Sequence, residues 1–135
     1  MAEVKGIGGV FIESPEPARL AAWYAGVLGI SMEPHDGGSR GYFHVFQVRD
    51  LDEPAMIRNN PVLAIQPNAV VPEATANVIV NLRIDDLERF VASLHERGYS
   101  PTPIVEDPFG LFSTLSDPEG NRLELYEERF PEDLE

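Results

Sequence analysis

The sequence predicts an α+β fold in which one strand–helix–three-strand pattern occurs twice. Three observations predict it: strand patterns outnumber helix patterns, only two segments have helical periodicity, and the order of elements restarts after a proline-containing stretch. Such a mixture favours sheets with antiparallel pairing that carry their helices on one face. We therefore expect a single domain over residues 1–135, with a first module over about 5–67, a linker over 68–76 and a second module over about 77–128.

The first half begins with an alternating strand over residues 6–14, which places Phe11 on the side opposite to its valine and isoleucine neighbours. Ser14 is a typical N-cap residue and Pro15 suits the first helical position, so a helix is expected from there to Gly29, which suits a C-cap. Further strands are expected over 30–34, 41–49 and 61–66, with polar loops at 35–39 and 50–60.

The second half repeats this order. A strand over 77–84 alternates cleanly, and Asp86 belongs to an aspartate pair that is suited to cap a second helix ending at Gly98. Strands are then expected over 100–105, 111–116 and 122–127.

Glu124 is the residue that is most suggestive of chemistry. It lies in the middle of the last strand between Leu123 and Leu125, directly after the Asp-Pro-Glu-Gly-Asn turn that begins at Asp117. If the apolar sides of the strands pack on the helices, the opposite sides line a concavity, with Glu124 as the candidate catalytic residue. The side chains expected to line this ligand cavity are Phe11, His44, Phe46, Asn81, Arg83, Phe109, Phe112, Arg122 and Tyr126.

Composition and charge exclude several classes of function. Twenty-three acidic against ten basic residues give a net charge of -13, which repels nucleic acid and anionic membranes. The same charge either solubilises the surface or attracts a cationic small molecule. Cysteine is absent, so disulfides and thiolate chemistry are excluded. No apolar run approaches the ~18 residues of a membrane span and no signal-peptide pattern is present, so we expect a cytoplasmic protein.

Three segments, residues 17–30, 80–90 and 117–127, resemble the vicinal oxygen chelate superfamily, which includes glyoxalase I, bleomycin-resistance proteins and extradiol dioxygenases. The resemblance implies two βαβββ modules whose curved sheets surround a ligand cavity. It also implies assembly as a homodimer. The fold hosts many chemistries, so the resemblance indicates the fold more strongly than the reaction.

The resemblance further implies where a catalytic member would hold a divalent metal, on the first and last strands of each module. The corresponding positions here are Gly9, Ala64, Ile79 and Glu124, of which only Glu124 can bind a metal. Catalytic metal sites need about three protein ligands, so no cofactor is expected and a divalent metal is disfavoured, with His44 as a conceivable substitute ligand.

Three functions therefore stay open. The protein binds a small cationic or aromatic organic ligand, as the bleomycin-resistance members would suggest; it is a metal-dependent lyase, isomerase or dioxygenase that uses Glu124; or it is a dimeric interaction protein. In the alternative without chemistry, Glu124 forms a structural ion pair with Arg83 or Arg122.

Overall fold

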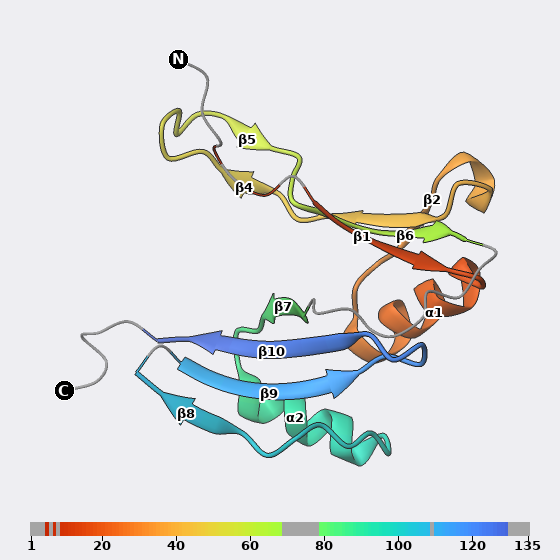
Figure 1. Cartoon of the computed structure of the whole chain (residues 1–135). Coiled ribbons are helices and arrows are strands. Elements are labelled where there is room, and N and C mark those ends of the chain that lie inside the picture. The colour runs from red at the N-terminus through yellow and green to blue at the C-terminus, as the bar shows by residue number, and fades with distance from the viewer. Residues whose placement is uncertain (1–4, 6, 8, 69–78, 109, 130–135) are drawn as a thin grey trace. The chain divides into compact units, whose positions relative to one another are not determined.

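The computed structural model describes residues 5, 7, 9–68, 79–108 and 110–129. The chain divides into two compact units, Met1–Glu73 and Ala74–Glu135 (Figure 1). The linker expected over 68–76 lies outside the described residues except for Asn68. No helix in the described part of the chain is long and apolar enough to cross a membrane.

The first unit contains a four-stranded sheet in the order β1-β6-β3-β2. Its strands are β1 (Gly9–Ser14), β2 (Glu33–Pro34), β3 (Tyr42–Val45) and β6 (Val62–Pro67). The pair β1–β6 is parallel, whereas β3 pairs antiparallel with both β6 and β2. A single-turn helix, η1 (Asp36–Gly38), connects β2 to β3.

Helix α1 (Pro17–Leu28) covers one face of this sheet because its apolar stripe matches the apolar side of the strands. Leu20 and Tyr24 of the helix are buried together with Leu63 and Ile65 of β6. Ile12 of β1 is also buried, and its neighbour Phe11 is 60% exposed, as the alternation of the strand predicts.

The start of α1 differs from the sequence prediction. Glu16 occupies the N-cap and Pro17, instead of Pro15, is the first helical residue. The hydroxyl of Ser14 accepts a hydrogen bond from the Glu16 backbone N–H at 3.0 Å, so Ser14 stabilises the turn before the helix and does not cap it. The predicted end is confirmed: Gly29 has φ 72° and its N–H donates to the Ala25 carbonyl.

The strand expected over 41–49 is divided in the structure. After β3 ends, the chain leaves the four-stranded sheet and forms a separate antiparallel hairpin from β4 (Val48–Arg49) and β5 (Ile57–Arg58). The expected loop over 50–60 therefore contains a strand.

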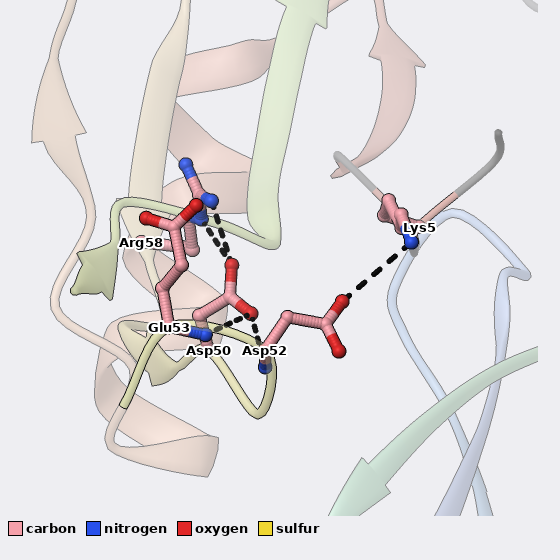
Figure 2. A network of polar contacts seen from close by, with 5 residues as sticks. All are labelled: Lys5, Asp50, Asp52, Glu53 and Arg58. Carbon is pink, nitrogen blue, oxygen red and sulfur yellow. Dashed lines mark hydrogen bonds and ion pairs between the residues drawn. The ribbon is translucent and has the colours of Figure 1, made fainter. Parts of the chain in front are cut away.

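A polar network at the tip of the hairpin gives the physical reason for this division (Figure 2). One oxygen of the Asp50 carboxylate accepts the backbone N–H groups of Asp52 and Glu53 at 2.9 and 3.3 Å, which turns the chain back. The other oxygen binds the Arg58 guanidinium, with nitrogen–oxygen distances of 2.6 and 2.8 Å. In addition, Lys5 forms an ion pair with Asp52 at 3.6 Å.

The second unit has the same topology as the first. Its sheet order is β7-β10-β9-β8, from strands β7 (Ile79–Arg83), β8 (Val105–Asp107), β9 (Gly110–Ser116) and β10 (Arg122–Glu128), and its first and last strands again run parallel. Helix α2 (Leu87–Glu96) covers one face (Figure 1). Leu87 and Leu94 of α2 are fully buried, as are Leu123 and Leu125 of β10. The repeat predicted from the sequence is confirmed.

Local details of the second unit agree with the sequence prediction except at one strand. Asp86 caps α2, and its side chain accepts the Arg89 backbone N–H at 3.2 Å. The strand expected over 100–105 is present only from Val105, because the prolines at 101 and 103 have no N–H to donate to a ladder.

Candidate functional site

The face of the second sheet opposite α2 brings Glu124 and Asn81 together. Strand register aligns Asn81 of β7, Glu124 of β10 and Thr114 of β9 in one row across the sheet. The Asn81 side-chain amide donates a hydrogen bond to Glu124 Oε1 at 2.8 Å. Because Asn81 is exposed and Glu124 is half-buried, this carboxylate–amide pair is accessible to a ligand.

An aromatic pair occupies the adjacent row of the same face. Phe112 of β9 and Tyr126 of β10 are register partners, and their rings stack with centroids 5.0 Å apart and planes inclined by 22°. Arg83 of β7 is the next residue in this row. Both residues are half-buried, so part of each side chain is exposed to solvent.

The two arginines of this face do not neutralise Glu124. Arg83 and Arg122 lie in the rows on either side of it, and both are exposed. Within the part of the chain that the structure describes, Glu124 forms no ion pair with either residue, and Asn81 is its hydrogen-bond partner. The interpretation of Glu124 as half of a structural ion pair is therefore wrong for these residues. The second carboxylate oxygen of Glu124 can accept a hydrogen bond from a ligand.

Six of the predicted site residues thus lie together on one face of one sheet. They are Asn81, Arg83, Phe112, Arg122, Glu124 and Tyr126. Phe109 lies outside the described residues.

The remaining predicted residues belong to the first unit, where the register corrects one of them. Phe11 shares its face with Ala64 and Phe43, away from α1. His44 is the register partner of Leu63 and lies on the opposite face from Phe11, so the expectation that both face one cavity surface is wrong. The alternation within β3 causes this difference, because Phe43 occupies the position that faces the Phe11 side.

The surroundings of His44 nevertheless fix its ring. Its Nδ1 lies 2.7 Å from the Ser31 carbonyl oxygen, and its ring meets Phe46 edge-on at a centroid distance of 4.6 Å. Phe46 follows β3 directly and is 36% exposed. His44 borders a pocket between the edge of β3 and the start of the hairpin, and none of the pocket's other lining residues was predicted from the sequence. Glu33 belongs to the two-residue strand β2, Gln47 directly precedes β4, and Asn59 directly follows β5; none of them carries a sequence signal for a site.

The described residues do not fit the metal site that the superfamily resemblance implies. Of its four positions, Gly9, Ala64 and Ile79 offer no ligand atom, and a Cβ added to Gly9 would lie 2.7 Å from the backbone oxygen of Val62. A histidine at that position would require the β1 or β6 backbone to shift. No group of three histidine, aspartate or glutamate side chains in the described part of the chain could hold a metal ion.

Comparisons with known proteins agree with this architecture. The glyoxalase-like domain family matches residues 9–126. An antibiotic-binding protein, TnmS3 of Streptomyces sp. CB03234, is 18% identical with a TM-score of 0.65, over 96% of this chain and 100% of that one. The bleomycin resistance determinant encoded on transposon Tn5 is 19% identical with a TM-score of 0.63, over 90% and 97%.

A third similar structure has an enzyme name. The lactoylglutathione lyase of Agrobacterium tumefaciens is 15% identical with a TM-score of 0.64, and the match covers 93% of this chain and 95% of the lyase. Among the curated proteins, none matches this chain. At these identities the structural matches demonstrate a shared fold, which antibiotic-binding proteins and enzymes both use.

Proposed function

Because the chain belongs to the glyoxalase-like domain family of the vicinal oxygen chelate superfamily, we propose that it binds a small aromatic, cationic organic ligand without a metal. The similar structures include an antibiotic-binding protein and a bleomycin resistance determinant, which supports the binding of a small organic molecule. The observation that carries the proposal is the pairing of two features on one open sheet face: the Glu124–Asn81 hydrogen bond and the Phe112–Tyr126 stack.

These two features complement a planar cation. The stacked rings offer apolar surface to an aromatic ring system, and such ring pairs contribute about 0.5–1.5 kcal/mol beyond their buried area. Glu124 accepts an N–H of the ligand while Asn81 holds the carboxylate in place. The net charge of -13 draws cations toward the protein, and the flanking Arg83 and Arg122 restrict the favourable position to Glu124.

The absence of a metal is part of the proposal. Glu124 would supply one metal ligand, whereas catalytic metal sites use about three protein ligands. The Gly9 position has no space for a side chain that could supply a second metal ligand. Glu124 therefore acts as a hydrogen-bond acceptor for the ligand.

Calorimetry with proflavine, a planar aromatic cation that carries N–H donors, tests the proposal. Glu124→Gln should weaken binding about tenfold, since a hydrogen bond to a charged group contributes about 1.5–3 kcal/mol. Phe112→Ala should weaken it about 3–10-fold through loss of stacking. Glu96→Gln is the matched control, because it makes the same charge change at an exposed position of α2.

Two results would contradict the proposal. Equal effects of Glu124→Gln and Glu96→Gln would mean that only the overall charge matters. Stoichiometric bound metal in the purified protein, lost in Glu124→Gln, would favour the metal-dependent enzyme instead; elemental analysis of both proteins decides this.

We also propose that the chain forms a homodimer in the cytoplasm. The β4–β5 hairpin and its tip expose the apolar side chains of Val48, Leu51 and Ile57, and Leu51 is 95% exposed. Exposed apolar surface of this kind is common at contacts between subunits.

A further inference from the structure

The first unit contains a pocket that the proposed function does not use. Its volume is about 390 Å³, within the ~300–1,000 Å³ that small-molecule sites commonly have. The lining residues are Glu33, Phe43, His44, Val45, Gln47 and Asn59. None of them belongs to the Glu124 face of the second unit, so the two sites share no residue.

The topology of the first sheet creates this pocket. Strand β2 pairs with Tyr42 and Phe43, so within the described residues the β2 side of strand β3 is unpaired beyond Phe43. The base of the β4–β5 hairpin forms another wall, where the Gln47 side-chain amide donates to the Asn59 side-chain oxygen at 2.8 Å. The pocket therefore lies between the end of a short strand and the beginning of the hairpin.

Both polar walls are held in place by contacts outside the pocket. The Ser31 carbonyl can only accept a hydrogen bond, so His44 Nδ1 must carry a proton, and in the neutral ring Nε2 is an acceptor. On the hairpin side, Asp50, which follows β4, binds Arg58 of β5 (Figure 2). Arg58 is the neighbour of Asn59 in the chain, so this contact supports the Gln47–Asn59 wall. A pocket whose walls are fixed before binding loses less entropy when a ligand enters.

The lining combines one carboxylate with apolar and acceptor groups. Glu33 provides negative charge, and Phe43 and Val45 provide apolar surface. Among the lining residues that the structure describes, there is no lysine or arginine. The strand register places Glu33 opposite Phe43, on the same face of the sheet. A cationic group at Glu33 would therefore have an aromatic ring beside it.

From this arrangement we propose that the pocket is a second binding site, specific for a small planar organic cation such as an aryl amidine. The cationic nitrogens donate to the Glu33 carboxylate, and the aromatic ring lies against Phe43 and Val45. The Gln47–Asn59 amide pair offers further hydrogen bonds. Asp50 is a positioning residue for this site, since it holds the hairpin wall without lining the pocket.

Benzamidine and its neutral isostere benzamide separate charge from shape in the test. We expect benzamidine to shift the backbone amide NMR signals of residues 43–47 and 59 in the full-length protein. Benzamide should bind about fivefold more weakly than benzamidine; the factor is modest because Glu33 is exposed and its ion pair with the ligand is partly screened. Glu33→Gln should weaken benzamidine binding by the same factor and leave benzamide binding unchanged. Phe43→Leu should weaken both compounds.

Matched variants keep this site distinguishable from the Glu124 face. Glu124→Gln should leave benzamidine binding in the pocket unchanged, and Glu33→Gln should leave proflavine binding at Phe112 and Tyr126 unchanged. The inference fails if Glu33→Gln binds benzamidine like the original protein, if benzamide binds equally well, or if benzamidine shifts only signals of residues 112–126. In the last case the proposed function would stand without the second site.

Discussion

Asp117 should control the stability of the second unit through the turn that precedes Glu124. It is 5% exposed and lies directly between the end of β9 and the start of β10. Asp117 Oδ1 accepts the backbone N–H groups of Glu119 and Asn121, both at 2.9 Å, and Oδ2 accepts the Asn121 side-chain amide at 2.7 Å. This turn sets the β9–β10 register that places Glu124 opposite Thr114.

The size of the effect follows from these three hydrogen bonds. Each hydrogen bond to a charged group contributes about 1.5–3 kcal/mol, but bonds that share one carboxylate do not add. Water can reach part of the turn after the side chain is removed, because Glu119 is exposed and Asn121 is half-buried. We therefore expect Asp117→Ala to lower the free energy of unfolding by about 2–4 kcal/mol.

Urea unfolding followed by circular dichroism measures this change. Asp117→Asn should lie between the original protein and Asp117→Ala, since its oxygen still accepts the backbone N–H groups while its amide nitrogen meets the Asn121 amide, donor against donor. A destabilisation of less than about 0.5 kcal/mol in Asp117→Ala would refute the reasoning, because a surface substitution without a structural role produces a change of that size.

Two further predictions concern the first unit and the assembly. Hydrogen bonding to Arg58 and to the Asp52 and Glu53 N–H groups lowers the pKa of Asp50 below its usual 3.8. The Asp50–Arg58 contact should therefore stabilise the hairpin above about pH 4 and be lost as the pH falls through the lowered pKa. An NMR titration that gives Asp50 a pKa of 3.8 or higher would contradict this prediction. Light scattering should give twice the 15.0 kDa chain mass if the homodimer forms, and Ile57→Asp should shift the mass toward one chain; a monomer at all salt concentrations would exclude the dimer.

The sequence predicted much of the Glu124 face because period-two alternation determines which strand residues share a side. Asn81, Arg83, Arg122, Glu124 and Tyr126 were all assigned to the side opposite the buried leucines, and the structure places them there. The assignment of His44 failed for the same physical reason. A one-residue uncertainty in the register of an unaligned strand moves a side chain to the other face.

The pocket in the first unit was beyond sequence reasoning. Glu33, Gln47 and Asn59 lie 26 positions apart at the extremes, and none of them belongs to a recognisable motif. They line one pocket because β2 ends early and because Asp50 turns the chain into a hairpin.

By itself, the sequence determined the repeated strand–helix–strand order, the buried side of each long strand, the helix caps at Gly29 and Asp86, and the turn at Asp117. These features depend on contacts between residues that are close in the chain, where periodicity, glycine and aspartate act locally. Only the tertiary structure decided that Glu124 is paired with Asn81, that Phe112 stacks on Tyr126, and that His44 borders the pocket at the edge of β3. Those contacts depend on which strands are neighbours and on the register in which they pair. Both properties are determined by residues that are far apart in the chain.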